Sequence, residues 1–262
     1  MAGKVFWGLN SLNGGDQGPS NPTLLLLGDS WFWYPFNNLA NELASQLSVG
    51  HVLLVLGNNG AEAQEWSTKY RKQIDQAFKW HAGNAQALLL SGGGNDVAGP
   101  EDFDPLIEDH CEGKPTVESC YSPGQPASLL GKVRTSYEEV IAKFRKYNPT
   151  APIFTHNYEK AWPTGAGVFG PGKWLKVPMD AAQVPDKFRH PLFVDLIGQL
   201  HAEQKAIPSA VTGPGKFIPI KTAGTLPDDA DVWANELHLK PAGYKKMVRK
   251  VWLPALKAEG IA

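Results

Sequence analysis

Cysteine is nearly absent from this sequence, which contains only Cys111 and Cys120. Structural zinc sites usually combine four Cys or His ligands. No second pair of ligands accompanies these two residues, so we expect no metal site. Their short separation, within a segment rich in Pro and Gly, permits a local disulfide, and two reduced thiols are an equally good interpretation.

Long hydrophobic runs are also lacking. The aliphatic run Leu24–Leu27 has the length of a strand rather than of a bilayer span, so we expect no membrane-spanning segment. The stretch Met1–Pro22 has one Lys among Gly, Asn and Ser, without the continuous apolar core of a secretory signal. We expect a cytoplasmic protein if this sequence is complete, and an exported one if a leader was removed.

Neither sign of charge is in excess. The chain has 25 Lys and Arg against 26 Asp and Glu, a formal net charge of -1. This balance argues against nucleic acid or an anionic membrane surface as a partner. With 262 residues, 42% of them hydrophobic, and no linker-like stretch, the sequence predicts a single domain over residues 1–262. The oligomeric state is left open.

Short aliphatic runs alternate with amphipathic segments along the chain, which is typical of a parallel sheet flanked by helices. Uninterrupted aliphatic stretches are expected where both faces of a strand are covered. We therefore predict a three-layer α/β/α, flavodoxin-like fold with a central parallel sheet of five strands. The predicted strands are Thr23–Leu27, His51–Leu56, Gln86–Ser91, Ala151–His156 and Phe217–Lys221.

Helices are predicted between these strands. Leu39, Leu43 and Leu47 recur every four residues, and Asn37 or Asn38 can serve as the N-cap. The other predicted helices are Glu62–Trp80, Leu129–Tyr147, Pro191–Lys205 and Pro241–Lys257.

Two long segments, Val97–Ala127 and Glu159–His190, interrupt the alternation. Connections of this length are usually functional or disordered. We expect both insertions to lie over the carboxyl edge of the sheet, where ligand sites of α/β proteins form. The alternative is that they are passive surface loops.

Gly28-Asp29-Ser30 directly follows the first aliphatic run. A serine placed between a strand and a helix presents its hydroxyl at the edge of the sheet. The backbone amides beside it can face a developing oxyanion. Taken alone, this tripeptide is more typical of an ordinary turn.

Two glycine-rich turns follow the next two strands. Gly57-Asn58-Asn59-Gly60 can offer an unobstructed backbone N–H, and Gly92-Gly93-Gly94-Asn95-Asp96 adds an Asn side chain that can donate to an oxyanion. Asn235-Glu236-Leu237-His238 precedes the last predicted helix. There a histidine can act as general base, and the residue three positions earlier can orient its ring.

In this order, the four motifs resemble the conserved blocks of the SGNH (GDSL-type) serine hydrolase superfamily. The resemblance extends from about Thr23 to the last helix and does not cover the insertions. It implies that Ser30 is the nucleophile and His238 its base. It also implies an oxyanion hole formed by Ser30 N–H, Gly60 N–H and the Asn95 side chain, and a serine esterase that needs no cofactor. Asp29 and Asp96 are expected to brace loops.

The last motif departs from the family pattern Asp-x-x-His, because Asn235 occupies the acidic position. An asparagine cannot supply a negative charge to an imidazolium, although its side-chain oxygen can orient the ring. We favour Asn235 or a backbone carbonyl in this role. The alternatives are a nearby acid (Asp229, Asp231 or Glu236) or a degenerate site. Glu236 is expected to point away from His238.

The residues after the nucleophile, Trp31 to Phe36, are strongly aromatic. We place Trp31 in the substrate pocket, while core packing explains at least half of the aromatic residues. The resemblance implies hydrolysis of a carboxylic ester, whether of a small molecule, a carbohydrate or a lipid, through an acyl-enzyme on Ser30. The alternatives are an acyltransferase on the same site, or a catalytically silent module that binds a carbohydrate or a partner.

Overall fold

A fully parallel, six-stranded sheet forms the centre of the molecule, with the strand order β1-β3-β2-β4-β5-β6. The computed structural model describes residues 2–13 and 21–262, so part of the stretch Met1–Pro22 lies outside the described residues. The predicted α/β/α fold is confirmed. The strands are β1 (Lys4–Trp7), β2 (Leu24–Gly28), β3 (Val52–Gly57), β4 (Ala87–Ser91), β5 (Ile153–His156) and β6 (Phe217–Ile220).

The prediction of five strands is wrong, because β1 adds a sixth at the edge of the sheet beside β3. None of its four residues is fully buried, so its sequence lacks the aliphatic run that marks the other strands. By contrast, β2 and β4 are completely buried. The five predicted strands all exist, within two residues of their expected ends.

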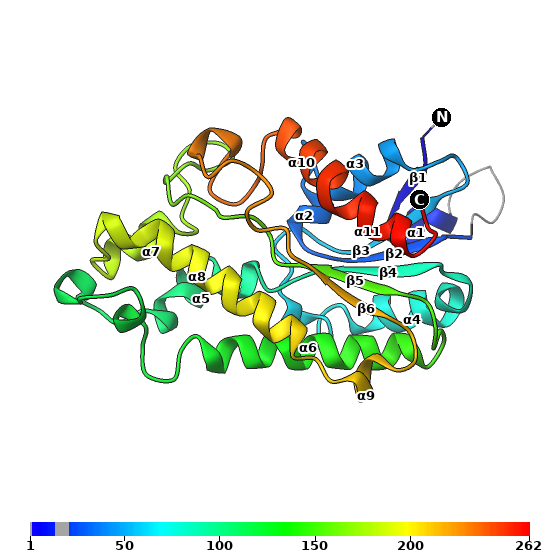
Figure 1. Cartoon of the computed structure of the whole chain (residues 1–262), viewed down its shortest axis with the longest axis horizontal. Helices are drawn as coiled ribbons and strands as arrows, with labels where there is room; N and C mark the ends of the chain where they lie inside the picture. The colour runs from blue at the N-terminus through cyan, green and yellow to red at the C-terminus, as the bar shows by residue number, and fades with distance from the viewer. Residues whose placement is uncertain (1, 14–20) are drawn as a thin grey trace.

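Helices cover both faces of the sheet (Figure 1). One face carries α3, α10 and α11, and the other carries α4, α6 and α8. A π-helix, Val248–Trp252, joins α10 to α11. The helices are α1 (Gly8–Asn13), α2 (Ser30–Trp33), α3 (Leu39–Gln46), α4 (Arg71–His81), α5 (Pro100–Phe103), α6 (Ala127–Arg145), α7 (Lys176–Ala181), α8 (Asp186–Lys205), α9 (Ser209–Thr212), α10 (Pro241–Met247) and α11 (Leu253–Ala258).

Two predicted helices need correction. The first half of Glu62–Trp80 is the 3-10 turn Ala63–Glu65 followed by further turns, and the α-helix begins only at Arg71. The Asp96 carboxylate accepts from the backbone N–H groups of Ala63 and Gln64 at the start of this segment. The helix predicted from Pro191 begins at Asp186, so that Pro191 lies inside α8. The expected cap of α3 is Asn38, whose side chain accepts a 2.8 Å hydrogen bond from Asn41 N–H.

The carboxyl ends of three central strands lie side by side. Gly28 of β2 pairs with both Gly57 of β3 and Ser91 of β4. Gly57 has a φ of 95°, and a Cβ there would lie 2.1 Å from the Gly28 carbonyl oxygen. Only glycine fits this conformation and this close approach. The turns that follow these strands therefore begin next to one another.

The two insertions extend beyond the carboxyl ends of β4 and β5, toward the left of Figure 1. The first contains α5 and a disulfide between Cys111 and Cys120, whose Cα atoms are 5.3 Å apart. The second contains α7 and the first turn of α8. Cys111 N–H donates to the Ala182 carbonyl at 3.0 Å, so the insertions contact each other. Over the described residues, no helix combines the length and apolarity needed to cross a bilayer.

Candidate active site

Ser30 is the first residue of α2, immediately after β2. Asp29 caps this helix, because its side chain accepts a 3.0 Å hydrogen bond from Trp31 N–H. The first N–H groups of a helix have no intrahelical acceptor. Ser30 N–H is therefore available as a hydrogen-bond donor. Ser30 also lines a small pocket.

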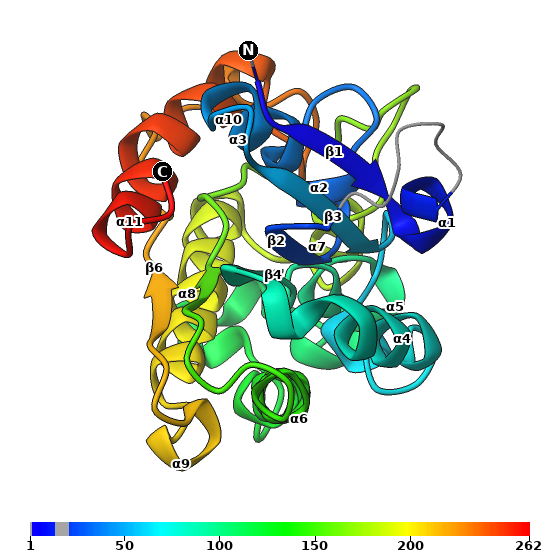
Figure 2. The same ribbon diagram turned by 90° about the vertical axis from the view of Figure 1, so that its right-hand side faces the viewer.

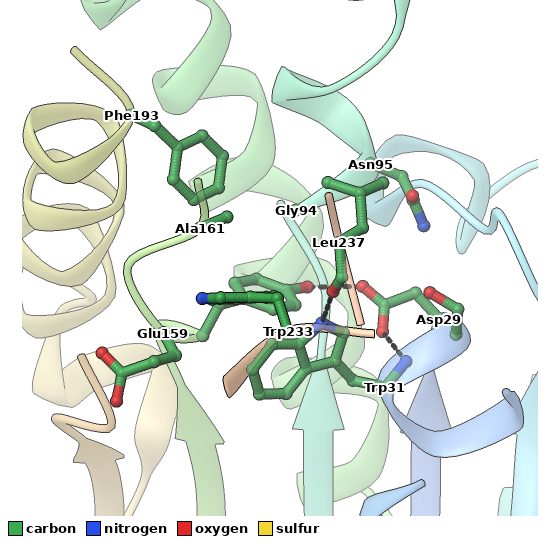
Figure 3. A pocket seen from close by; sticks show the side chains of 11 residues that line it. Asp29, Trp31, Gly94, Asn95, Glu159, Ala161, Phe193, Trp233 and Leu237 are labelled. Atoms are coloured by element: carbon green, nitrogen blue, oxygen red, sulfur yellow. Dashed lines mark hydrogen bonds between the residues drawn. The ribbon is translucent and has the colours of Figure 1, made fainter. Parts of the chain in front are cut away.

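The pocket beside Ser30 is small, about 20 Å³. Figure 3 shows Asp29 and Asn95 on one side of it, with Phe193 and Glu159 opposite. The predicted pocket residue Trp31 does line it, but its indole is 4% exposed and also packs against the core. The other lining residues are Ser30, Gly94, Tyr158, Ala161, Trp233 and Leu237.

A buried hydrogen-bond network lies behind the nucleophile. Asp29 accepts from Ser91 Oγ at 2.8 Å and from the Tyr158 hydroxyl at 2.5 Å. Ser91 Oγ in turn lies 2.9 Å from His156 Nε2, while His156 Nδ1 accepts from Tyr158 N–H at 3.2 Å. The His156 proton is therefore on Nε2, and Ser91 donates onward to Asp29. This bracing role matches the expectation for Asp29.

Burial shifts the pKa of both ionisable ends of this network. Desolvation lowers the pKa of His156 to about 3, so the ring is neutral. Desolvation also raises the pKa of Asp29 to about 6, even though the hydrogen bonds from Tyr158, Ser91 and Trp31 favour the carboxylate.

Asn235 occupies the first position of the last motif, where the family pattern has an aspartate. Its Oδ1 lies 3.0 Å from His238 Nδ1 and also accepts from the backbone N–H groups of Leu237 and His238, each at 2.9 Å. Backbone N–H groups only donate, so this atom must be the amide oxygen. His238 Nδ1 therefore carries the hydrogen, and Nε2 presents its lone pair.

His238 Nε2 is buried and has no hydrogen-bond partner within the part of the chain that the structure describes. The imidazole stacks on the Tyr34 ring, with centroids 3.9 Å apart and planes 4° apart. Tyr34 also accepts a 3.2 Å hydrogen bond from Asn235 Nδ2. Desolvation lowers the pKa of His238 to about 4.

A side-chain hydrogen bond ties the serine helix to the histidine loop, because Trp31 Nε1 donates to the Leu237 carbonyl at 3.0 Å. Tyr34, whose N–H ends that helix by donating to the Ser30 carbonyl at 2.7 Å, stacks on His238. Residues adjacent to Ser30 and His238 are thus bonded directly, and Tyr34 contacts both segments. No hydrogen bond joins Ser30 Oγ to His238 among the described residues. Such catalytic contacts are often long in unliganded enzymes.

The predicted oxyanion donors are partly free. Gly60 lies at a φ of 71° on an exposed turn, and its N–H has no acceptor among residues 2–13 and 21–262. Asn95 Nδ2 donates one hydrogen to the Ala61 carbonyl at 3.0 Å, which leaves its second hydrogen available. Asp96 accepts from Gly93 N–H and Ala63 N–H, and so braces both glycine-rich turns as expected.

Glu236 points away from His238, into the second insertion. Its buried carboxylate accepts from four backbone N–H groups, of Gly165, Trp174, Leu175 and Lys176, at 2.8–3.3 Å. Sequence reasoning missed this anchor, although the residue belongs to the last motif. It also missed Tyr34, which stands four residues after Ser30.

Of the other acids considered as partners of His238, Asp229 is engaged elsewhere. Asp229 accepts from Asp231 N–H at 2.8 Å and caps its own turn. Within the described segments, neither residue bonds to His238, and no three His, Cys, Asp or Glu side chains gather as metal ligands.

No family model and no curated protein matches this sequence. Solved structures resemble the fold along most of the chain. An extracellular lipase from Streptomyces rimosus is 13% identical, with a TM-score of 0.53 over 91% of this chain and 99% of that one. A carbohydrate esterase family 3 structure from Talaromyces cellulolyticus is 11% identical, with a TM-score of 0.52 over 92% and 99%. The chain has the SGNH hydrolase fold.

A third SGNH structure, an acetyl esterase determined with an acetate ion, is 11% identical with a TM-score of 0.51, covering 91% of this chain and 98% of that one. At these identities the likeness concerns the fold. The five predicted strands form the adjacent set β3-β2-β4-β5-β6, and β1 lies beside β3 at the edge of the sheet.

Proposed function

We propose that this SGNH-fold chain is a serine esterase that hydrolyses carboxylic esters through an acyl-enzyme on Ser30. The observation that supports this most directly is the state of His238. Its Nδ1 hydrogen is fixed by Asn235, and its buried Nε2 is bare. A neutral imidazole with an open lone pair is what a general base requires.

In the proposed reaction, Ser30 Oγ attacks the ester carbonyl carbon while its proton passes to His238 Nε2. The tetrahedral oxyanion accepts hydrogen bonds from Ser30 N–H, Gly60 N–H and Asn95 Nδ2. The carbon–oxygen bond to the alcohol then breaks, and His238 returns the proton to the leaving alcohol. Water repeats these steps on the acyl-enzyme and releases the acid.

Asn235 orients His238 without neutralising the imidazolium that forms during the reaction. The Tyr34 ring lies flat against that imidazole at 3.9 Å, and an aromatic face attracts a cation. We propose that Tyr34 provides part of the stabilisation that an aspartate would otherwise supply.

The dimensions of the pocket support a short acyl group. Its volume of about 20 Å³ is comparable with the space that one water molecule needs. Ala161, Phe193 and Trp233 form its apolar part. So small a space disfavours a long acyl chain, and an acetyl esterase is among the structures of the same fold.

The test is burst kinetics on p-nitrophenyl acetate with wild type and Ser30→Ala. We expect turnover in the wild type, its loss in the variant, and labelling of Ser30 by a fluorophosphonate. Ser45→Ala, at an exposed serine of α3, is the control and should behave as wild type. Absence of both turnover and labelling would overturn the esterase and favour a silent binding module. Transfer of acetyl to added glycerol in preference to water would favour an acyltransferase.

A further inference from the structure

A groove of about 570 Å³ lies at the carboxyl ends of β1 and β3, separate from the pocket beside Ser30. Figure 2 shows α1 next to the ends of these two strands. One wall comes from Trp7 to Asn10, at the end of β1 and the start of α1, and the other from α4. The groove therefore depends on β1, the edge strand that the sequence did not predict.

Two connections join this groove to the candidate active site. Trp33 lines the groove and is the last residue of α2, the four-residue helix that Ser30 begins. Gly57 and Asn58 also line it, on the turn that leads to Gly60. Because β1 lies two strands from β2, these two strands are roughly 10 Å apart across the sheet, and Ser30 directly follows β2.

Aromatic rings form the floor of the groove. Trp7 and Trp33 are half-buried and in contact, with ring centroids 5.0 Å apart and planes tilted by 57°. Trp33 is fixed by a 3.0 Å hydrogen bond from its Nε1 to the Leu56 carbonyl. Tyr70 adds a third half-buried ring. Such rings offer flat apolar faces with polar edges.

Primary amides surround these rings: Asn10, Asn58, Gln73 and Gln76. Gln73 is held in place because its Oε1 accepts from Gly57 N–H at 3.1 Å, which leaves its amide hydrogens available. An amide donates and accepts in one plane. It therefore suits neighbouring hydroxyl groups, each of which can also donate and accept.

We propose that this groove binds an oligosaccharide whose acyl ester is presented to Ser30. Aromatic faces match the C–H faces of sugar rings, and the amides match their hydroxyls. Lys72 is the one charged residue among those that line the groove, which is too little positive charge for a nucleic-acid backbone. A lipid chain would need a predominantly apolar wall. This inference rests on the proposed esterase function and specifies its substrate class as O-acylated glycans.

The test compares p-nitrophenyl acetate with acetylated xylo-, manno- and pectic oligosaccharides of one to four sugars. We expect kcat/KM to rise about tenfold or more with chain length for at least one series. Trp7→Ala should lower the ratio of kcat/KM on the tetrasaccharide to that on p-nitrophenyl acetate by about tenfold, mainly through KM. Gln76→Ala, at an exposed side chain of α4, should act in the same direction without a risk to folding.

Two matched controls lie outside the groove. Trp80→Ala removes an exposed indole near the C-terminal end of α4. Gln86→Ala removes an exposed amide just before β4, at the amino ends of the strands, whereas the groove lies at their carboxyl ends. Both should keep the dependence on chain length. Rates that do not change with chain length in any series, or equal effects of Trp7→Ala on long and short substrates, would overturn the groove assignment.

A binding experiment separates this assignment from the proposed reaction. Calorimetry on Ser30→Ala with the same oligosaccharides should detect binding that the additional substitution Trp7→Ala weakens about tenfold. If Ser30→Ala retains wild-type turnover, the esterase mechanism fails, while the calorimetry still tests the groove. Absence of binding to every oligosaccharide would contradict the groove even where p-nitrophenyl acetate is hydrolysed.

Discussion

The Tyr158 hydroxyl donates a 2.5 Å hydrogen bond to the carboxylate of Asp29, the residue directly before Ser30. Tyr158 has a φ of 59°, a conformation that costs a residue with a side chain roughly 1 kcal/mol or more. Its ring packs so closely on Gly94 that a Cβ there would lie 2.7 Å from it. The segment after β5 is therefore fixed against the turns that hold Ser30 and Asn95. The Asp29 carboxylate that makes this contact is buried, and burial raises its pKa.

This burial predicts a pH-dependent cost to stability at Asp29. Its pKa rises from an ordinary value of 3.8 to about 6 in the folded protein, so the folded state binds more protons than the unfolded state between these values. The stability contribution of Asp29 is therefore highest below pH 3.8 and falls as the pH rises through about 6, by about 3 kcal/mol in total.

Asp29→Asn removes this titration while keeping an oxygen that can accept from Trp31 N–H. We expect the free energy of unfolding of the variant, minus that of wild type, to increase by about 2 kcal/mol between pH 4 and pH 7. Urea titrations of both proteins at four pH values in this range measure the difference, and other ionisable groups cancel because both proteins share them. Parallel pH profiles would show that Asp29 does not titrate as described.

The substitution Asn235→Asp tests how the proposed mechanism works with an amide in place of an acid. A carboxylate beside Nδ1 stabilises the imidazolium, which raises the pKa of His238 from about 4. Because the base acts in its neutral form, kcat/KM of wild type should fall only as the pH drops through about 4. In the variant this acid limb should move upward by about one pH unit or more, and kcat at pH 8 should rise about tenfold.

Asn235→Ala is the companion variant. It removes the acceptor that holds the Nδ1 hydrogen, and we expect kcat to fall about a hundredfold or more, since the wrong tautomer becomes accessible. Profiles of kcat/KM against pH on p-nitrophenyl acetate measure both effects. An acid limb in the same position for Asn235→Asp and wild type would contradict the role given to His238.

The sequence predicted the parts of this fold and site that depend on local pattern. Strands β2 to β6 were predicted because burial of both faces leaves an aliphatic signature, whereas β1, half-exposed at the edge, leaves none. The motif residues Ser30 and Asn95 were placed correctly because each follows a strand, and neighbouring parallel strands end together. Their catalytic roles stay predictions.

Other parts of the site depend on pairs of residues that are distant in the chain. Tyr158 meets Asp29 across 129 positions, and neither residue alone signals the other. Glu236 binds the amides of an insertion about 60 to 70 positions earlier, so its function is decided by how that insertion folds. The first half of the predicted helix Glu62–Trp80 also contacts a residue distant in the chain, because Ala63 N–H and Gln64 N–H donate to Asp96.

Glu236→Gln should loosen the second insertion. The buried carboxylate accepts four backbone N–H groups, and a glutamine would turn an N–H₂ group toward some of them. Hydrogen bonds to a charged acceptor are among the stronger ones, so we expect a loss of about 3 kcal/mol in the free energy of unfolding. Limited proteolysis should cut residues 159–190 faster, whereas Glu139→Gln, at an exposed glutamate of α6, should leave the digestion unchanged. Wild-type proteolysis of Glu236→Gln would remove its role as an anchor.

The stacked ring of Tyr34 should affect the charge of the base. Tyr34→Ala uncovers the imidazole, and because burial is what lowers the pKa of His238, that pKa should return toward its ordinary value of 6.5. The acid limb of kcat/KM should shift upward accordingly. Tyr34→Phe keeps the ring and loses only the acceptor of the 3.2 Å bond from Asn235 Nδ2, so its acid limb should stay near that of wild type. Equal shifts in the two variants would mean that the hydroxyl, rather than the stacked ring, controls His238.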